Sequence, residues 1–220
     1  MKRTACNGSH QPILEAYGLQ SMPVEKLKLL HFLPGEYLYR MGKAPEYLML
    51  MVSGRAKVCV ASENGKTLLL TFYSGAGLLG DIELVLGLPA ATSDVQAISE
   101  LTAIGIPYAC GTDLLQNPVF VLKLAKELAR HVDCNSQNSV ATVLNPLQAR
   151  LCSYIRIVCA NGFFHEKLTE LAELLGTSYR HLLRTLDALC MQGVLSREEN
   201  GFRVMDEEAL QSLGGDAYRF

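Results

Sequence analysis

The spacing of apolar residues near the C-terminus predicts two short helices joined by a tight turn. In the stretch 168–175, leucine and alanine recur at every third or fourth position, which is typical of a helix with one buried face. Gly176 follows, where a left-handed residue ends a helix at little cost. A second helix then begins with Thr177 or Ser178 as its cap. Its apolar side is formed by Leu182, Leu186 and Leu189.

The polar side of the second predicted helix carries arginine and aromatic side chains, which suit a DNA major groove. An ordinary helical hairpin with a solvated basic face has the same spacing, so this pattern alone leaves both interpretations open. Strand-like runs at 194–197 and 202–204 then flank Asn200-Gly201, a strong hairpin-turn signal, and favour a winged helix. The candidate DNA-binding residues are Thr177, Ser178, Tyr179, Arg180, His181 and Arg184 on the helix, with Arg197 and Arg203 on the wing.

Short β-prone runs broken by glycine turns occupy residues 29–107, and many short strands of this kind predict a barrel, roll or sandwich. One break in this pattern, Asp81 to Leu86, reads as a short helix that ends at Gly87. A turn is expected at 63–66, between two of the strands. The predicted strands are 33–38, 47–52, 55–60, 68–73, 95–98 and 101–106.

A single long helix is predicted from Pro118 to Leu144, with Asn117 as its cap. The stripe Val121, Leu124, Leu128 and Val132 suits a two-helix seam, although a stripe packed on the chain's own sheet has the same spacing. The polar residues after 132 indicate either a solvated segment or the wall of a polar pocket. Asn145-Pro146 then breaks the helix and forms a hinge before a further helix at 147–159.

Composition limits the partners and the compartment. The 220 residues have a formal net charge of −2, which argues against a globally basic nucleic-acid coat but not against a site-specific binder with local positive charge. No apolar run is long enough to span a bilayer, and a membrane partner is not expected. The seven cysteines are scattered without a Cys-x-x-Cys motif, which fits thiols in a reducing cytoplasm.

The order of these elements, a β-roll, a long helix, an Asn-Pro hinge and a winged helix, resembles that of the Crp/Fnr transcription regulators. The segments 33–36 with Gly42, and 50–58, are similar to the two roll signatures of the family. The segment 80–92 resembles its phosphate-binding cassette. The resemblance covers about residues 25 to 205, and the segments 164–167 and 178–183 look most like the YeiL-type subgroup.

The resemblance implies an α+β fold with three parts. These are a jelly-roll-like double-stranded β-roll sensor domain over 1–116, a long dimerisation helix over 117–144, and a winged helix-turn-helix DNA-binding domain over 145–220. It also implies a non-enzymatic, cytoplasmic homodimer that binds a two-fold symmetric site on double-stranded DNA and contacts RNA polymerase.

The cassette departs from the family pattern where a cyclic nucleotide would bind. Asp81 stands where the family's glutamate contacts the ribose, and no arginine lies between Gly80 and Glu100 to hold the cyclic phosphate. Cyclic nucleotide binding is therefore disfavoured, and an unidentified small effector is expected instead. No other cofactor or metal is expected, because the cysteine cluster of the iron–sulfur members is missing and nothing marks haem ligands. The candidate effector-binding residues are Gly80, Asp81, Ile82, Glu83, Ala90, Ala91, Thr92, Asn135 and Ser136.

Two alternatives remain open from the sequence. The same regulator scaffold can instead sense oxidants through Cys59, Cys110 or Cys134, if their thiolates are favoured and exposed. A cupin-type enzyme has a similar strand pattern, but its chemistry needs clustered histidine and carboxylate ligands. Because His31 is the only histidine in the roll region, the enzyme alternative is weak.

Overall fold

The computed structural model describes residues 1–6, 10–62, 66–215, 217 and 218. Contacts divide the chain into two units, Met1–Val58 with Phe72–Asp133, and Cys59–Thr71 with Cys134–Phe220. Residues 63–65 of the expected turn lie outside the described part of the chain. The three-part division expected from the sequence stays a prediction.

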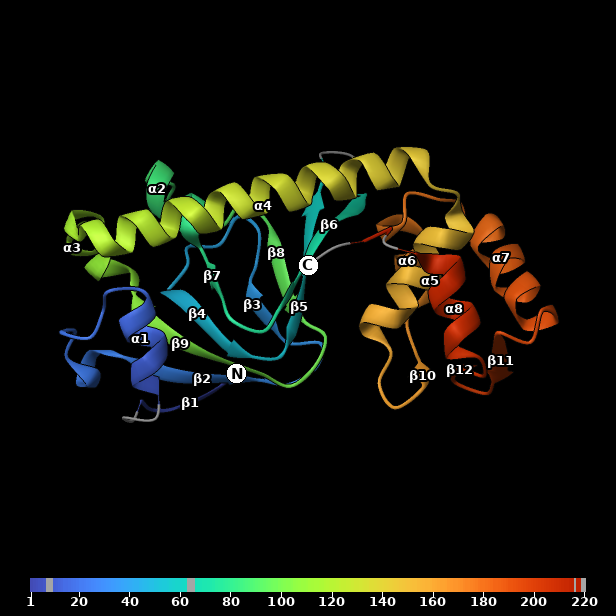
Figure 1. The fold of residues 1–220 in the computed structure, drawn as a ribbon, viewed down its shortest axis with the longest axis horizontal. Helices are drawn as coiled ribbons and strands as arrows, with labels where there is room; N and C mark the ends of the chain where they lie inside the picture. Colours follow the sequence, from blue (N-terminus) through green and yellow to red (C-terminus); the bar gives the residue numbers. More distant parts are fainter. Residues whose placement is uncertain (7–9, 63–65, 216, 219–220) are drawn as a thin grey trace. The chain divides into compact units, whose positions relative to one another are not determined.

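Two antiparallel sheets form the β-roll, and together with the helices they confirm the predicted α+β class (Figure 1). The strand runs predicted between 47 and 106 are present, and the first predicted run is shortened to β3. The strand β1, which no apolar pattern marks, pairs with β2 at one edge of the first sheet. In order, that sheet contains β1 (Lys2–Ala5), β2 (Lys28–Phe32), β9 (Leu101–Pro107), β4 (Tyr47–Ser53) and β7 (Gly77–Leu79). The second contains β3 (Tyr37–Tyr39), β8 (Asp94–Ala97), β5 (Arg55–Ala61) and β6 (Thr67–Ser74).

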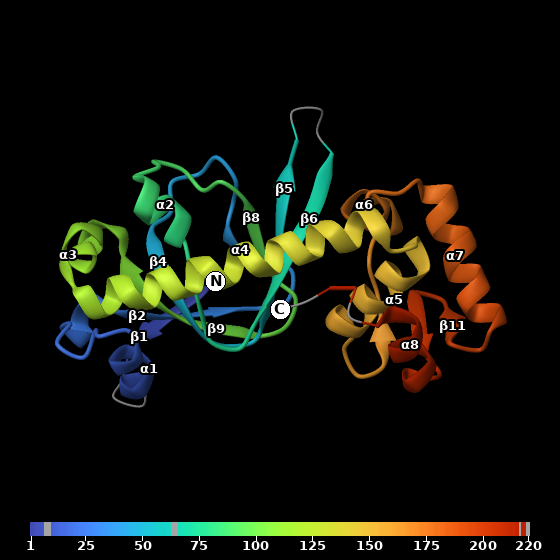
Figure 2. The same ribbon diagram turned by 45° about the horizontal axis from the view of Figure 1, so that its top comes forward.

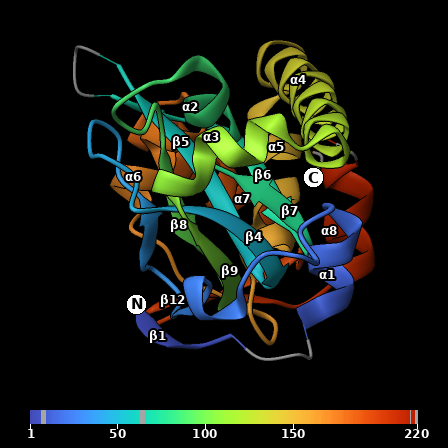
Figure 3. The ribbon, with the colours of Figure 1, turned by 90° about the vertical axis from the view of Figure 1, so that its left-hand side faces the viewer.

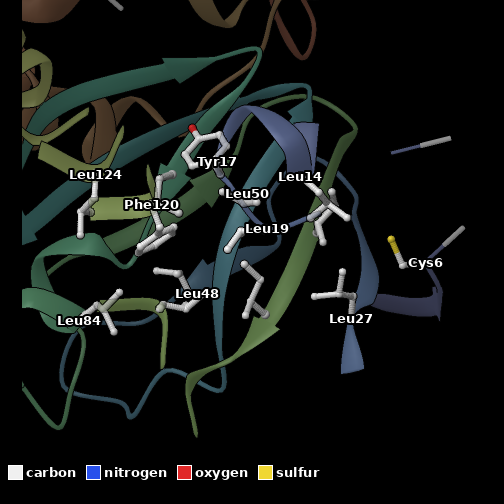
Figure 4. Close-up of a cluster of buried hydrophobic side chains, with 14 of the residues drawn as sticks. Cys6, Leu14, Tyr17, Leu19, Leu27, Leu48, Leu50, Leu84, Phe120 and Leu124 are labelled. Carbon is white, nitrogen blue, oxygen red and sulfur yellow. The ribbon is translucent and has the colours of Figure 1, made fainter. Parts of the chain in front are cut away.

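The hydrophobic core of the first unit lies between its first sheet and helices from both ends of the unit (Figure 4). Leu48 and Leu50 of β4 contribute from the sheet, and Leu14 contributes from α1 (Gln11–Ala16). Phe120 and Leu124 contribute from α4 (Pro118–Leu144). β4 lies between two strands of its sheet, and its first five residues are buried, which explains why it reads as a continuous apolar run.

The first unit also contains short helical elements besides α1. The helix α2 (Asp81–Leu86) has the bounds that the sequence predicts, and in Figures 1 and 2 it lies beside the first half of α4. Leu84 of α2 meets Gly111 at the start of α3 closely enough that a Cβ on Gly111 would be 2.7 Å from the leucine methyl group. The remaining elements are η2 (Val24–Lys26), η3 (Tyr108–Cys110) and α3 (Gly111–Gln116).

The long helix α4 begins and ends where the sequence predicts. The Asn117 side chain caps it by accepting from the backbone N–H groups of Val119 and Phe120, at 3.0 and 3.3 Å. The predicted dimer seam is wrong as a set, because Leu124 is only 2% exposed and Leu128 packs on the roll, whereas Val121 and Val132 are exposed. The buried face of α4 also carries polar and sulfur-containing side chains, which are Glu127, His131, Cys134 and Asn138.

The second unit contains the winged helix (Figure 3). Its wing pairs β10, β12 and β11 in that order, and α8 packs on α5. Among the described residues, no helix has the length and apolar character needed to cross a membrane. The elements are α5 (Leu147–Val158), β10 (Phe163–Phe164), α6 (Leu168–Leu174), α7 (Tyr179–Met191), β11 (Leu195–Glu198), β12 (Gly201–Val204) and α8 (Glu207–Gly214).

The burial of Leu124 gives a direct test of the corrected helix face. We expect Leu124→Ala to lower the free energy of unfolding by about 2 to 5 kcal/mol, because it leaves a cavity in the roll core. Lys126→Ala, at an exposed position of the same helix, should change it by less than about 0.5 kcal/mol. Urea denaturation measures both values. Equal effects of the two substitutions would mean that this side of α4 does not pack on the roll.

Candidate DNA-binding surface and effector site

The turn between α6 and α7 is fixed by backbone geometry and by one buried arginine. Gly176 has φ +59°, and the N–H of Thr177 donates to the carbonyl of Ala172 at 2.9 Å, which ends α6 in a Schellman motif. The buried guanidinium of Arg150, on α5, donates to the carbonyl of Leu175. These contacts satisfy backbone groups at the C-terminus of α6 and set where α7 begins.

The helix α7 separates an apolar side from a polar side, as predicted. Leu182, Leu186 and Leu189 are fully buried. Ser178 is the N-cap, and its hydroxyl oxygen accepts from the backbone N–H of His181 at 3.2 Å. The predicted base-reading residues Tyr179, Arg180 and Arg184 are all exposed, together with His181. In the described part of the chain neither arginine has an ion-pair partner, so both guanidinium groups are available to an incoming anion.

The two wing arginines are exposed but paired with acids of the same chain. Arg197 lies 2.7 Å from the Asp187 carboxylate on α7, and Arg203 lies 2.5 Å from Glu198. Arg197 also lies over the ring of Phe202. A phosphate would therefore compete with an existing carboxylate for either side chain, so the wing offers weaker attraction than the free arginines of α7.

The wing is present as predicted, but its turn is displaced by one residue. The pairing of Glu198 with Gly201 leaves Glu199 and Asn200 as the turn, and neither residue has a positive φ. Gly201 is the first residue of β12, and a Cβ there would lie 2.4 Å from the Phe164 carbonyl oxygen. The glycine is therefore needed for close approach to β10, and not for the left-handed turn that Asn-Gly usually indicates.

The predicted effector cassette lies entirely in the first unit, where α2 faces α4. Asp81 is 3% exposed, and its Oδ2 lies 3.1 Å from Nδ1 of His131 on α4. The Tyr73 hydroxyl lies 3.3 Å from the same nitrogen, and the tyrosine and histidine rings meet edge to face at 4.9 Å. His131 Nε2 is buried without a hydrogen-bond partner in the described chain. These contacts join the cassette helix to α4.

The second acid of the cassette, Glu83, has its hydrogen-bond donors within the cassette. Glu83 is 6% exposed, and its Oε1 accepts from the backbone N–H of Thr92 at 2.7 Å and from the Thr92 hydroxyl at 2.6 Å. The preceding residue, Ala91, exchanges backbone hydrogen bonds with the turn at Gly42 and Lys43. The loop 88–92 is therefore held on both sides, by α2 and by that turn.

The structure brings some of the predicted effector residues together, and it assigns two others to the second unit. Glu83 and Thr92 are in contact, and Asp81 starts the same helix, with the side chain of Ile82 exposed. Asn135 and Ser136 belong to the second unit, where Asn138 contacts β6 by donating to the Thr71 hydroxyl at 3.1 Å. His131, Tyr73 and Asn138 were not among the predicted site residues, although positions 127, 131, 134 and 138 have the spacing of one helix face.

In the described residues, the cysteines and histidines lie in separate surroundings. Cys59 and Cys134 are buried, and Cys134 Sγ lies 3.5 Å from the Thr71 hydroxyl. Burial raises the pKa of the Cys152 thiol to about 11, which disfavours its thiolate. In the described ranges, no three His, Cys, Asp or Glu side chains are placed to hold a metal ion. Both ring nitrogens of His31 face threonine hydroxyls.

Two regions of the chain match known protein families. Residues 29–117 match the model of the cyclic nucleotide-binding domain, and residues 149–213 match the Crp-like helix-turn-helix domain. Of the solved structures, a Crp/Fnr-family regulator from Eubacterium rectale superposes with a TM-score of 0.73 at 14% identity, over 95% of each chain. TTHB099, a CRP-family regulator from Thermus thermophilus, gives 0.67 at 17% identity, over 86% of this chain and 98% of its own. At these identities the likeness shows the fold alone.

A curated relative shows the family. The chain is 32% identical to the regulatory protein YeiL of Escherichia coli O157:H7 over 190 residues, which are 84% of this chain and 85% of the relative. The matched domains, their order and the exposed recognition helix all agree with that relationship. The chain belongs to the Crp/Fnr family and is a DNA-binding transcription regulator of that type.

Proposed function

We propose that this regulator is a homodimer that binds a two-fold symmetric operator, with α7 in the major groove of each half-site and with the β-roll as its sensing domain. The observation that carries the proposal is the exposed face of α7, where Arg180 and Arg184 have no carboxylate partner in the described chain. Two free guanidinium groups close to a helix N-terminus suit the acceptor edges of guanine. Contact with RNA polymerase and action in the cytoplasm complete the proposal as expectations from the family.

The dimer is supported by a second pattern on α4, opposite the face that packs on the roll. Exposed residues recur there at alternating spacings of three and four, the repeat of a coiled-coil seam. Leu122 and Val132 are 60% and 66% exposed, and Val143 is 81% exposed. The side chains between them are small, which allows two helices to approach closely. The proposed seam is Leu122, Ala125, Ala129, Val132, Ser136, Ser139 and Val143.

No observation favours the thiol-sensing alternative over an effector in the roll. Cys59 and Cys134 are buried, which limits the access of an oxidant, and Cys110 is half-buried in η3. The cupin alternative gains no support either, because the described residues do not bring together a metal-binding set. The cassette at 80–92 therefore remains the expected effector site.

The base-reading role of Arg184 is tested by substitution. Operators are first selected from random double-stranded DNA with the wild-type protein, and affinities are then measured by fluorescence anisotropy. We expect Arg184→Ala to weaken the selected site by about 1 to 3 kcal/mol, because a bidentate contact to guanine is lost. Arg197→Ala should instead weaken all sequences about equally and reduce the salt slope by about 1, as a phosphate contact does. Wild-type affinity in Arg184→Ala would show that this face of α7 does not read the bases.

The proposed seam is tested by placing a charge in it. We expect Leu122→Glu to convert the dimer into a monomer, because two carboxylates would meet across a symmetric interface. Lys126→Glu introduces the same carboxylate at an exposed position outside the seam and should remain a dimer. Analytical ultracentrifugation gives the mass of each variant, and unfolding temperatures check that both fold. A folded, dimeric Leu122→Glu would reject this seam.

A further inference from the structure

The polar groups of the cassette are satisfied by the chain itself. One oxygen of Glu83 takes both a backbone N–H and a hydroxyl from Thr92, at 2.7 and 2.6 Å. A backbone amide beside a hydroxyl is the kind of donor pair that holds a phosphate oxygen in proteins. Glu83 forms no ion pair with any lysine or arginine of the described chain, so these two neutral donors hold its carboxylate.

The backbone carbonyl groups at the start of α2 also have hydrogen-bond partners within the chain. The Tyr108 hydroxyl donates to the Gly80 carbonyl at 2.5 Å, and the Tyr39 hydroxyl lies 3.0 Å from the Leu79 carbonyl. Burial, and the charges of Glu83 and Asp81, raise the pKa of Tyr108, so this hydroxyl stays a donor at neutral pH. A Cβ on Gly80 would be 2.7 Å from the Tyr39 oxygen, so tyrosine side chains fill the space beneath the helix.

The charge of the cassette opposes an anion. Asp81 and Glu83 are both buried, and no lysine or arginine lies between residues 80 and 100. The Oδ2 of Asp81 lies 3.1 Å from His131 Nδ1, and among the described residues this histidine forms no ion pair with Glu83. A phosphate on the Thr92 donors would have to displace the Glu83 carboxylate and leave it buried without partners, which is costly in a medium of low dielectric constant.

We infer that Glu83 is an internal anion that excludes cyclic nucleotides from this roll. Its carboxylate accepts from the Thr92 amide and hydroxyl, and it fixes the loop 88–92 on α2. Glu83 is thus the specificity-determining residue of the cassette, and the missing arginine is a second barrier. A ligand of this roll is neutral or cationic. The inference rests on the proposed function only in taking the roll as the sensing domain.

The test uses the full chain with two probes, cyclic AMP and inorganic phosphate, and reads the unfolding temperature by scanning calorimetry. Wild type should show no shift with about 1 mM cyclic AMP, whereas a dissociation constant near 10 μM would add about 2.7 kcal/mol and a clear rise. Glu83→Ala should unfold at a lower temperature, because Thr92 loses its acceptor. Phosphate should raise the unfolding temperature of this variant, and chloride at equal ionic strength should not.

Two further variants make the outcome decisive. Glu83→Gln keeps the length of the side chain and an oxygen that can accept from Thr92, but it removes the charge. It should therefore fold if Glu83→Ala does not, and it should also gain the response to phosphate. Glu100→Ala removes an exposed acid of the same unit and should behave as wild type with every probe. The inference is overturned if wild type binds cyclic AMP, if both Glu83 variants are as stable as wild type, or if neither gains a response to phosphate. No measurement contains DNA, so a wrong assignment of α7 would leave these results unchanged.

Discussion

Three carboxylates buried in the first unit set the constraint on which the roll and its helices depend. Asp81, Glu83 and Glu127 are each less than 7% exposed, and a buried charge is tolerated only with good partners. Each acid meets this need with a different segment. Asp81 faces His131 on α4, Glu83 binds Thr92, and Glu127 pairs with Lys123 and Arg130 and lies 3.5 Å from the Tyr17 hydroxyl. The same contacts that satisfy the charges therefore tie α2 to α4, and α4 to the N-terminal segment.

The second unit is stabilised differently, because the buried side chains of α7 are leucines and not charged groups. The leucine side of α7 is fully buried, and the Gly176 turn and the Ser178 cap fix where the helix starts. Arg150 is buried behind this turn, where its guanidinium satisfies the carbonyl oxygens of Leu175 and Asn145. Because the buried leucines, the turn and the cap already fix α7, its exposed side can keep arginines that form no ion pair with an acid of the described chain. This separation makes a DNA-reading surface compatible with a net charge of −2.

Local patterns predicted the local structure. The helix 81–86, the Asn117 cap, the Gly176 turn and the hairpin after α7 all follow from residues within a few positions of each other, and all are present. The predicted dimer seam failed at Leu124 and Leu128, because apolar spacing does not show which face of α4 packs on the roll and polar side chains such as His131 share that buried face. The predicted wing turn is one residue away from the observed turn. Gly201 is required by its close approach to β10, and the sequence of the two wing strands does not show this contact. The short elements β1, α1 and α8 have mixed composition and were not foreseen.

The contacts of the effector cassette were also only partly predictable from the sequence. The absence of an arginine between 80 and 100 is visible in the sequence, and the expectation that cyclic nucleotide binding is disfavoured rests on it. The partner of Glu83 is nine residues away, in a loop whose position depends on the turn at Gly42, and no periodicity reports that contact. The contact of Glu83 with Thr92 therefore supports a second physical reason for that expectation, besides the missing arginine.

The most direct test of a DNA-binding regulator whose roll is closed to nucleotides is the affinity for its selected operator with and without cyclic AMP. Fluorescence anisotropy at fixed salt concentration provides both values, and fixed salt is essential because phosphate contacts make the affinity salt-dependent. The account predicts tight binding without nucleotide and the same dissociation constant when about 1 mM cyclic AMP is present. Binding that tightens tenfold or more on addition of cyclic AMP would contradict it.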